Sequence, residues 1–218
     1  LLCEQGTDAR VTAITSSADL IYAAVGEKIA VFSGAGKVQE EWGPFESNSL
    51  ITSLSANESY VAFANATNKS VFILDKSGVM KYLIGKSDDP FVVPSAYFDV
   101  VLSEKNTIYT ANPGTKKIET RTFDGKIISS FGASGTDPGS FGGCCNPAHF
   151  AVIDEGFITA EKGINRIKVL DWNGNFTEFV SSVNKFVASV PLDIFSPDGK
   201  IIYGANPADS KLYIFTRK

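Results

Sequence analysis

Two adjacent cysteines, Cys144 and Cys145, are the side chains whose spacing in this sequence most directly suggests chemistry. A thiolate is a nucleophile, and two neighbouring thiols can close into a strained disulfide that is easily reduced. Such a disulfide would be a rigid apolar plate on which a ligand could stack. Two buried thiols that pack under a loop are the third possibility, because free cysteine is among the most often buried residue types. Successive side chains of an extended loop point in opposite directions, which favours the packed thiols.

The only histidine, His149, follows these cysteines at the start of a predicted strand. Asp99 and Asp193 hold corresponding positions in two other sequence repeats. One imidazole and two carboxylates at the same end of a fold could bind a divalent cation of the calcium type or transfer protons. Polar side chains that only hydrogen-bond water and loop backbone are the structural alternative. We expect no catalytic residue and no resident cofactor, and if a cation binds, Asp99, Asp193 and His149 are its expected ligands.

A charged cluster of Glu161, Lys162 and Arg166 follows the next predicted strand. Short polar residues stand at the equivalent strand ends of the other repeats, at Asn65, Asn112 and Asn206. Such side chains commonly accept hydrogen bonds from the amides of the following loop, so we expect a structural role for the recurring position. The charged cluster is absent from the other repeats. It is either part of a binding site or a solvent-exposed ion pair of little energetic worth.

The elements that must position these residues repeat with a period of about 45 to 50 residues. An alanine followed by a polar residue closes a short apolar strand at 64–65, 111–112, 160–161 and 205–206, which are 47, 49 and 45 residues apart. A second marker, a glycine in a tight turn, recurs at Gly36, Gly78, Gly125 and Gly174. The segments between the markers are short and rich in β-branched and aromatic residues, and helical periodicity is absent. The sequence therefore predicts an all-β repeat protein.

The repeats divide the chain into units at 10–43, 50–85, 97–131, 148–181 and 192–218. Four short antiparallel strands fit in each of the first four units, whereas the last has room for three. Four-stranded units of this length are typical of β-propeller blades, and ring closure removes exposed sheet edges. We therefore predict one β-propeller domain over residues 1–218 with five blades, in which residues 1–5 supply the outer strand of the last blade. A six-bladed propeller and a truncated six-bladed ring are the alternatives.

In such blades the long loops between blades and the loops between the second and third strands emerge on one face. That face collects the irregular sequence, with long loops at 86–97 and 132–148. Loops are where binding residues concentrate, so we expect function there. The candidate residues for binding a ligand or partner are Tyr97, Asp99, Asn112, Cys144, Cys145, Asn146, His149, Glu161, Lys162, Arg166 and Asp193.

Four blocks on this face are PSAYFDV at 94–100, NPG at 112–114, GCCNP at 143–147 and AEKG at 160–163. With the repeat, they resemble a bacterial subset of the NHL-repeat β-propellers. The resemblance implies a propeller fold, with six blades typical of the family, and no established activity. We expect an extracytoplasmic location. Lyases of the wider family use several histidines and a metal, which one histidine cannot reproduce. Relatives often carry a further cysteine where this chain has Gly142, so we expect no metal cluster held by thiolates.

Composition narrows the function classes. Twenty Lys and Arg against 24 Asp and Glu give a net charge of −4, which disfavours a nucleic-acid partner. No apolar run reaches the ~20 residues that span a bilayer. We expect a monomeric, non-enzymatic binding or scaffold module whose partner is a protein or a small molecule. The alternatives are a metal-dependent hydrolase or lactonase at the mouth of the central channel, and a redox or electron-transfer accessory that uses Cys144 and Cys145.

Overall fold

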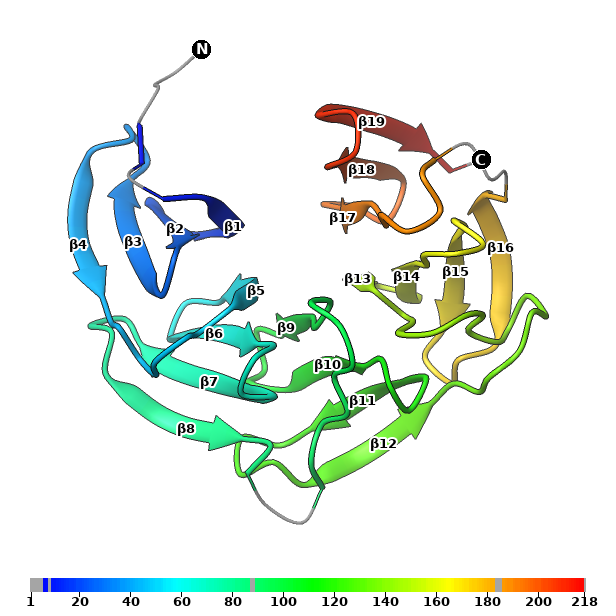
Figure 1. The fold of residues 1–218 in the computed structure, drawn as a ribbon, viewed down its shortest axis with the longest axis horizontal. Coiled ribbons are helices and arrows are strands. Elements are labelled where there is room, and N and C mark those ends of the chain that lie inside the picture. Colours follow the sequence, from blue (N-terminus) through cyan, green and yellow to red (C-terminus); the bar gives the residue numbers. More distant parts are fainter. Residues whose placement is uncertain (1–5, 8, 87–88, 183–185, 218) are drawn as a thin grey trace. The chain divides into compact units, whose positions relative to one another are not determined.

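The computed structural model describes residues 6–7, 9–86, 89–182 and 186–217. All regular secondary structure in these residues is β, in nineteen strands joined by turns and loops (Figure 1). None of the described residues belongs to a helix that could cross a membrane.

The strands form five antiparallel sheets in chain order. The first sheet has β1 (Val11–Ser17), β2 (Leu20–Val25), β3 (Lys28–Ser33) and β4 (Val38–Trp42). The second has β5 (Ile51–Ala56), β6 (Tyr60–Asn65), β7 (Ser70–Asp75) and β8 (Met80–Ile84). The third has β9 (Val100–Leu102), β10 (Ile108–Asn112), β11 (Lys117–Arg121) and β12 (Ile127–Phe131). The fourth has β13 (His149–Ile153), β14 (Gly156–Ala160), β15 (Ile167–Asp171) and β16 (Phe176–Ser181). The fifth has β17 (Asp193–Phe195), β18 (Ile201–Asn206) and β19 (Lys211–Thr216).

The predicted all-β propeller of five blades is confirmed. Four blades have four strands and the last has three among the described residues, as the repeat pattern predicts. The predicted pairing of residues 1–5 with the last blade falls outside the described residues.

Contacts within the chain divide it into two compact units. The first unit contains residues 1–91, 98–110 and 120–128, and the second contains 92–97, 111–119 and 129–218. Strands β10, β11 and β12 each continue from one unit into the other. The single domain predicted from the sequence stays a prediction.

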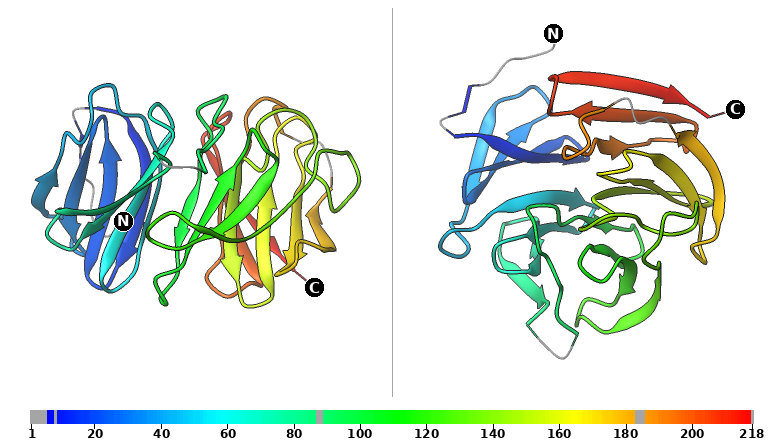
Figure 2. Two further views of the ribbon diagram at one scale, coloured as in Figure 1. Left: turned by 90° about the horizontal axis from the view of Figure 1, so that it is seen from below. Right: turned by 45° about the vertical axis from the view of Figure 1, so that its right-hand side comes forward.

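Each unit has its own apolar core. In the first unit, side chains of the first two sheets pack together around Tyr22, Trp42 and Phe63. In the second, the last sheet packs against β13 and β14, next to which it lies in Figure 2, and contributes Ile194 and Ile202 to the core. The middle strands of a sheet are covered on both faces, which is why β6 and β7 have almost continuously apolar sequences.

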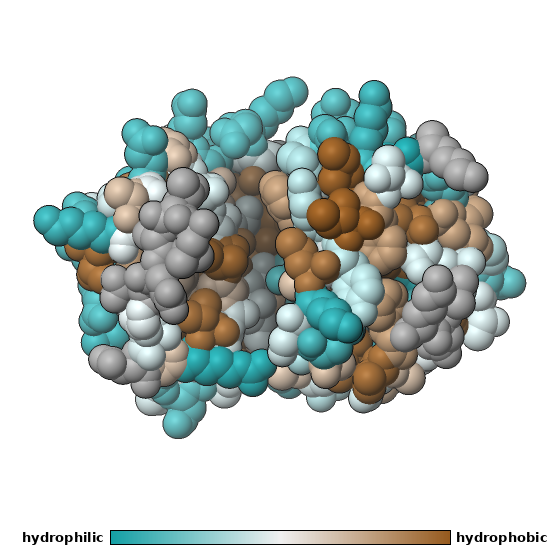
Figure 3. Space-filling view, turned by 90° about the horizontal axis from the view of Figure 1, so that it is seen from above, coloured by the Kyte–Doolittle hydropathy of each residue, from teal (hydrophilic) through white to brown (hydrophobic). Residues whose placement is uncertain are grey.

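The opposite face of the last sheet carries exposed apolar side chains, among them Leu212 and Ile214. The surface in Figure 3 likewise shows apolar patches among hydrophilic side chains. Exposed apolar side chains of this kind are common on protein surfaces.

The turn glycines of the repeat have a packing role. Gly78 and Gly174 both have positive φ, and a Cβ on either would lie within 3 Å of an aromatic ring, that of Trp42 or Phe131. Each ring belongs to the last residue of the outer strand of the preceding sheet. The repeated glycine therefore gives both a left-handed backbone and room for an aromatic ring.

Candidate functional site

The long loop 132–148 in the second unit is fixed by a buried charge cluster, defined here as Glu161, Arg166 and Lys168. The Glu161 carboxylate accepts hydrogen bonds from Arg166 Nε at 2.6 Å and from the Gly142 amide at 3.0 Å, and its Oε1 lies 3.1 Å from Lys168 Nζ. The Glu161 and Lys168 side chains are fully buried, and 5% of the Arg166 side chain is exposed. The predicted charged cluster is thus not a surface ion pair.

The two cations of the buried charge cluster bind the main chain of the loop. The Arg166 guanidinium donates to the carbonyl oxygens of Thr136, Asp137 and Ser140 at 2.8, 3.0 and 2.5 Å. Lys168 Nζ donates to the same Ser140 carbonyl at 2.5 Å. It also lies 4.4 Å from the centre of the Phe141 ring, a cation–π contact.

Two cations share the single carboxylate of Glu161, which shapes the acidity of Lys168. Burial disfavours the charged ammonium and lowers the pKa of Lys168 to about 8, while the Glu161 carboxylate opposes this shift and the neighbouring Arg166 charge adds to it. The ammonium therefore remains mostly protonated at neutral pH.

Asn146 joins the same loop to the segment after β14. Its amide group donates to the carbonyls of Gly142 at 2.5 Å and Lys162 at 2.9 Å, and its oxygen accepts from the Lys162 amide at 3.0 Å. Asn146 is fully buried. Like Glu161 and Arg166, it holds the predicted binding face from beneath the surface.

Cys144 and Cys145 are free thiols that differ in burial: Cys144 is exposed and Cys145 is buried. A hydrogen bond from the Cys145 thiol, followed by the positive charges of Lys162 and Lys116, lowers the pKa of Cys144. The Lys116 ammonium also donates to the carbonyl of Gly143. Cys145 has a φ of 61°, in the left-handed region that side chains other than glycine seldom occupy. The exposed thiol of Cys144 thus follows directly after a residue, Gly143, whose carbonyl binds the Lys116 ammonium.

An aromatic and charged cluster lies on the same unit. Lys162 Nζ lies 4.6 Å from the centre of the Tyr97 ring and 3.4 Å from Ser95 Oγ. The ring of Tyr97 meets the imidazole of His149 edge to face at 5.9 Å, and His149 Nδ1 lies 3.5 Å from Asp193 Oδ1. The His149 side chain is 13% exposed and that of Asp193 is 64% exposed. A pair of imidazole and carboxylate can exchange protons with a ligand.

Asp99 belongs to the first unit, where it is buried. Its Oδ1 accepts a 2.5 Å hydrogen bond from Ser53 Oγ and a 2.9 Å bond from the Val100 amide. Among the described residues, no three His, Cys, Asp or Glu side chains form a group that could hold a metal ion. A cation site made of Asp99, Asp193 and His149 stays a prediction.

The recurring polar position has a role that the sequence did not reveal. Asn65 and Asn206 accept from the following loop, as expected, at the amides of Asn68 and Ala208. In three blades the residue also accepts from an amide of the long loop that arrives from the preceding blade. These bonds are Leu50 N to Asn65 at 3.2 Å, Val92 N to Asn112 at 2.9 Å and Gly142 N to Glu161 at 3.0 Å. Glu161 is thus the charged version of a general loop anchor.

Lys116 and Lys168 were not among the residues selected from the sequence. A signal for Lys168 was available, because a lysine inside the apolar run of β15 must be buried or disrupt the sheet. For Lys116 the sequence held no signal, since the lysine meets Gly143 only through the fold.

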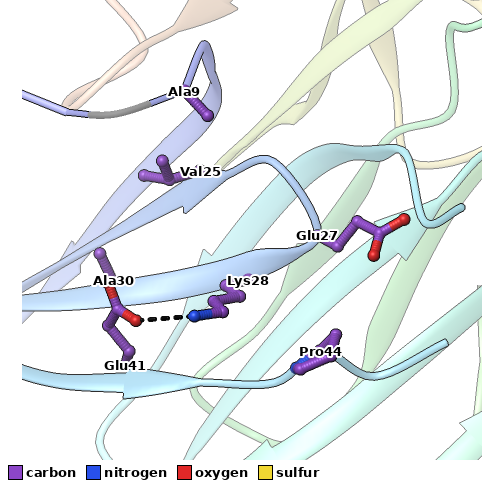
Figure 4. A pocket seen from close by; sticks show the side chains of 7 residues that line it. All are labelled: Ala9, Val25, Glu27, Lys28, Ala30, Glu41 and Pro44. Atoms are coloured by element: carbon purple, nitrogen blue, oxygen red, sulfur yellow. Dashed lines mark hydrogen bonds and ion pairs between the residues drawn. The ribbon is translucent and has the colours of Figure 1, made fainter. Parts of the chain in front are cut away.

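A cavity of about 340 Å³ lies on the first unit, and none of the predicted site residues lines it (Figure 4). Val25, Glu27, Ala30 and Pro44 are among its lining residues, together with the ion pair of Lys28 and Glu41. Both members of this 3.0 Å pair are about half exposed, so the cavity is an open surface depression. It offers a ligand no buried polar group.

Comparison with known proteins defines the fold and no more. No protein-family model and no curated protein matches the chain. Among solved structures, a catalytically inactive virginiamycin B lyase from Staphylococcus aureus with quinupristin is similar, with a TM-score of 0.69 and 16% identity over 98% of this chain and 68% of that one. Hydrazine synthase from Kuenenia stuttgartiensis has a TM-score of 0.64 and 16% identity over 94% of this chain and 59% of its own.

A structural-genomics protein of unknown function from Bacteroides thetaiotaomicron is similar to the same degree. Its TM-score is 0.68, with 16% identity over 94% of this chain and 58% of that chain. The chain thus spans 58 to 68% of the length of these three proteins. At such identities the likeness shows a shared β-propeller fold, which by itself carries no function.

Proposed function

We propose that this chain is an NHL-like β-propeller that works as a non-enzymatic binding module, through the loop-rich face of its second unit. The observation that carries the proposal is the buried charge cluster, which fixes loop 132–148 by four bonds to main-chain carbonyls and one from an amide. A loop ordered in advance loses less conformational entropy when it binds a ligand.

Stability alone is a poor explanation for the buried charge cluster. Removing charges from water costs several kcal/mol each, and apolar residues of similar volume often stabilise a protein at least as well. The cluster is better explained by the geometry that it imposes on the main chain of loop 132–148, which carries the exposed Cys144.

The blocks that resemble the NHL subset support the assignment because they contact one another. Ser95 and Tyr97 from PSAYFDV lie against the Lys162 ammonium of AEKG. The main chain of Lys162 in turn bonds to Asn146 of GCCNP. Three motifs far apart in the sequence thus lie next to one another, which supports a shared role.

The expected ligand is a protein segment or a small molecule that carries an anionic group. Lys116 and Lys162 supply positive charge, and the ring of Tyr97, partly exposed, supplies an apolar contact. Tyrosine next to a cation is a common composition for binding hot spots.

A catalytic function is the second candidate, and the pair of His149 and Asp193 favours it. Such a pair can act as a general base in a hydrolase or lactonase. We rank it second because the sequence has a single histidine, and the described residues contain no group of three His, Cys, Asp or Glu side chains that could hold a metal ion.

The test is a display selection of random peptides, with the purified chain as bait, followed by titration calorimetry of the enriched peptides. We expect acidic and aromatic peptides whose binding weakens at least tenfold in Lys162→Glu and Tyr97→Ala. Lys200→Glu is the matched control. Lys200 lies in the turn that joins the end of β17 to the start of β18, whereas the proposed site lies at the start of β17, so this variant should bind as the parent protein does.

Peptides whose affinity is equal in all variants, or falls equally in Lys200→Glu, would contradict the proposal. Assays of esters and lactones with added Ca²⁺ address the second candidate. Turnover that His149→Ala abolishes would replace the binding module by an enzyme.

A further inference from the structure

Cys144 is exposed and lies near the C-terminal end of loop 132–148. On one side the Gly142 amide is held by the Glu161 carboxylate at 3.0 Å. On the other side the buried Asn146 bonds to the main chain of Lys162 in both directions. The thiol is therefore presented to solvent on an anchored turn, with little freedom to withdraw.

The groups around Cys144 favour its thiolate. Hydrogen bonding by Cys145 and the positive charges of Lys162 and Lys116 lower the pKa of Cys144. Lys116 is placed by a hydrogen bond to the carbonyl of Gly143, next to the cysteine in the chain. A thiolate is the nucleophilic form of cysteine and attacks disulfides.

Cys145, the next residue in the chain, supplies a second thiol. It is buried, so a reagent in solution meets Cys144 first. An exposed thiolate beside a protected thiol is the arrangement in which one cysteine attacks and the other resolves the product.

We propose that Cys144 and Cys145 form a redox modification site that small anionic disulfides oxidise to a vicinal disulfide. The Cys144 thiolate attacks one sulfur of the reagent, so that a bond forms between that sulfur and Cys144 and the reagent's own S–S bond breaks. One anionic thiolate leaves. Cys145 then gives its proton to water and attacks the Cys144 sulfur, which displaces the second thiolate. The protein loses two electrons and two protons, and the reagent is reduced to two thiols.

The charge of the reagent follows from the lysines. Positively charged side chains that flank a reactive group raise the local concentration of anions and can accelerate their encounter by a factor of ten or more. A neutral disulfide gains nothing from them, and a cationic disulfide is repelled. The site goes beyond the binding function proposed above and does not depend on which partner the surface takes.

The experiment uses the full reduced chain with Cys3→Ser, so that only the adjacent pair reacts, and follows intact mass with time. Oxidised glutathione is the anionic probe and cystamine the cationic one. We expect oxidised glutathione to convert the protein to a species two hydrogens lighter, about tenfold faster than cystamine does. Dithiothreitol should restore the starting mass.

Substitutions separate the two steps. Cys145→Ser should accumulate the mixed glutathione disulfide at position 144, with Cys145→Ala as a second variant should the serine disturb folding. Cys144→Ser should be at least tenfold slower in all reactions, and Lys116→Met with Lys162→Met should remove the preference for the anionic probe. Thermal melting confirms that each variant is folded.

Three results would overturn the proposal. The first is a mixed disulfide that persists in the protein with both cysteines as long as it does in Cys145→Ser. The second is a Cys144→Ser variant that reacts as fast as the parent. The third is equal rates for the anionic and the cationic probe.

Discussion

Lys168 is a lysine whose charged form is destabilised by burial in the folded protein. Its ammonium lies between the Phe141 ring and the Glu161 carboxylate, and a second cation, Arg166, shares that carboxylate. Burial therefore lowers the pKa of Lys168 to about 8. A lysine in an unfolded chain has a pKa near 10.4.

This difference predicts how stability depends on pH. Below pH 8 the lysine is protonated in both states, and the folded state bears the full cost of the buried charge. Between about pH 8 and pH 10 the folded protein gives up the proton and the unfolded chain keeps it, so the free energy of unfolding rises with pH. We expect a rise of ~2–3 kcal/mol in urea unfolding, since each pKa unit is worth about 1.4 kcal/mol.

Lys168→Met should abolish that rise, whereas the exposed Lys200→Met should retain it. An identical pH profile for Lys168→Met and the parent protein would show that Lys168 does not titrate in this window.

Arg166 should contribute more to stability than any surface ion pair. Arg166→Met leaves the carbonyls of Thr136 and Asp137 without their donor and the buried Glu161 with one cation fewer. We expect a loss of ~3–5 kcal/mol in urea unfolding, as for other broken buried pairs. Amide hydrogen exchange in loop 132–148 should become faster at the same time.

The exposed pair of Lys28 and Glu41 is the matched control. Lys28→Met should change stability by less than about 1 kcal/mol, because surface pairs contribute little. Equal losses in Lys28→Met and Arg166→Met would contradict the role of the buried charge cluster.

At the residue scale, the sequence identified Glu161, Arg166 and Asn146 as special but not where they would lie. Their types suggested contact with a ligand, and the fold buries all three. Burial at a loop end depends on how the preceding blade delivers its chain, and no local pattern encodes that. Of the two thiols that were expected to pack under the loop, only Cys145 is buried, whereas Cys144 is exposed. The expectation assumed an extended loop, and the φ of 61° at Cys145 departs from that backbone.

At the element scale, the tight turns connect neighbouring sheets as well as strands. The ring of Trp42 lies over Gly78, and that of Phe131 lies over Gly174. The sequence predicted the glycine turns from their period. It could not predict the aromatic partners, because these come from the preceding sheet and follow from packing between sheets.

Gly174→Ala should therefore destabilise the protein in two ways. A Cβ at this position would lie 2.3 Å from a ring atom of Phe131, and the φ of 82° already strains any residue with a side chain. We expect a loss of ~2–5 kcal/mol in urea unfolding, from ~1–2 kcal/mol of backbone strain and ~1–3 kcal/mol of overpacking.

Gly163→Ala separates the two contributions. Gly163 has a φ of 86°, but no atom lies within 4 Å of the added Cβ. It should lose only the ~1–2 kcal/mol of backbone strain. Equal losses at the two positions would mean that contact with the ring contributes nothing.

For the whole molecule, the repeat period correctly predicted five blades and the three strands that the last one has among the described residues. It did not predict the division into two compact units, which passes through β10, β11 and β12. The repeat period depends on features that all blades have in common. The division instead depends on how the contacts of the third sheet are distributed between the two units.

Because three strands continue from one unit into the other, we expect both units to unfold in a single transition. The two tryptophans test this, since Trp42 lies in the first unit and Trp172 in the second. Each variant, Trp172→Phe or Trp42→Phe, keeps one tryptophan that reports on one unit. In each variant, the midpoint of urea unfolding measured by fluorescence should equal the midpoint measured by circular dichroism.

Substitutions in either core should shift that common transition. Phe63→Ala and Ile158→Ala remove fully buried side chains, one from each unit, and should each cost ~2–5 kcal/mol. Two separate midpoints, with each substitution moving only one of them, would instead establish two independently folding domains.

The buried charge cluster binds loop 132–148 chiefly through its main chain, so side chains of the loop other than Phe141 and Asn146 have few constraints from this anchor. Arg166 and Lys168 bind carbonyl oxygens, and Glu161 binds an amide, all groups that every residue except proline supplies in full. The residues at the tip of the loop could thus be exchanged, by evolution or by a designer's library, while the framework beneath stays the same. A surface of this kind can acquire new binding specificities while the fold and its stability stay largely unchanged.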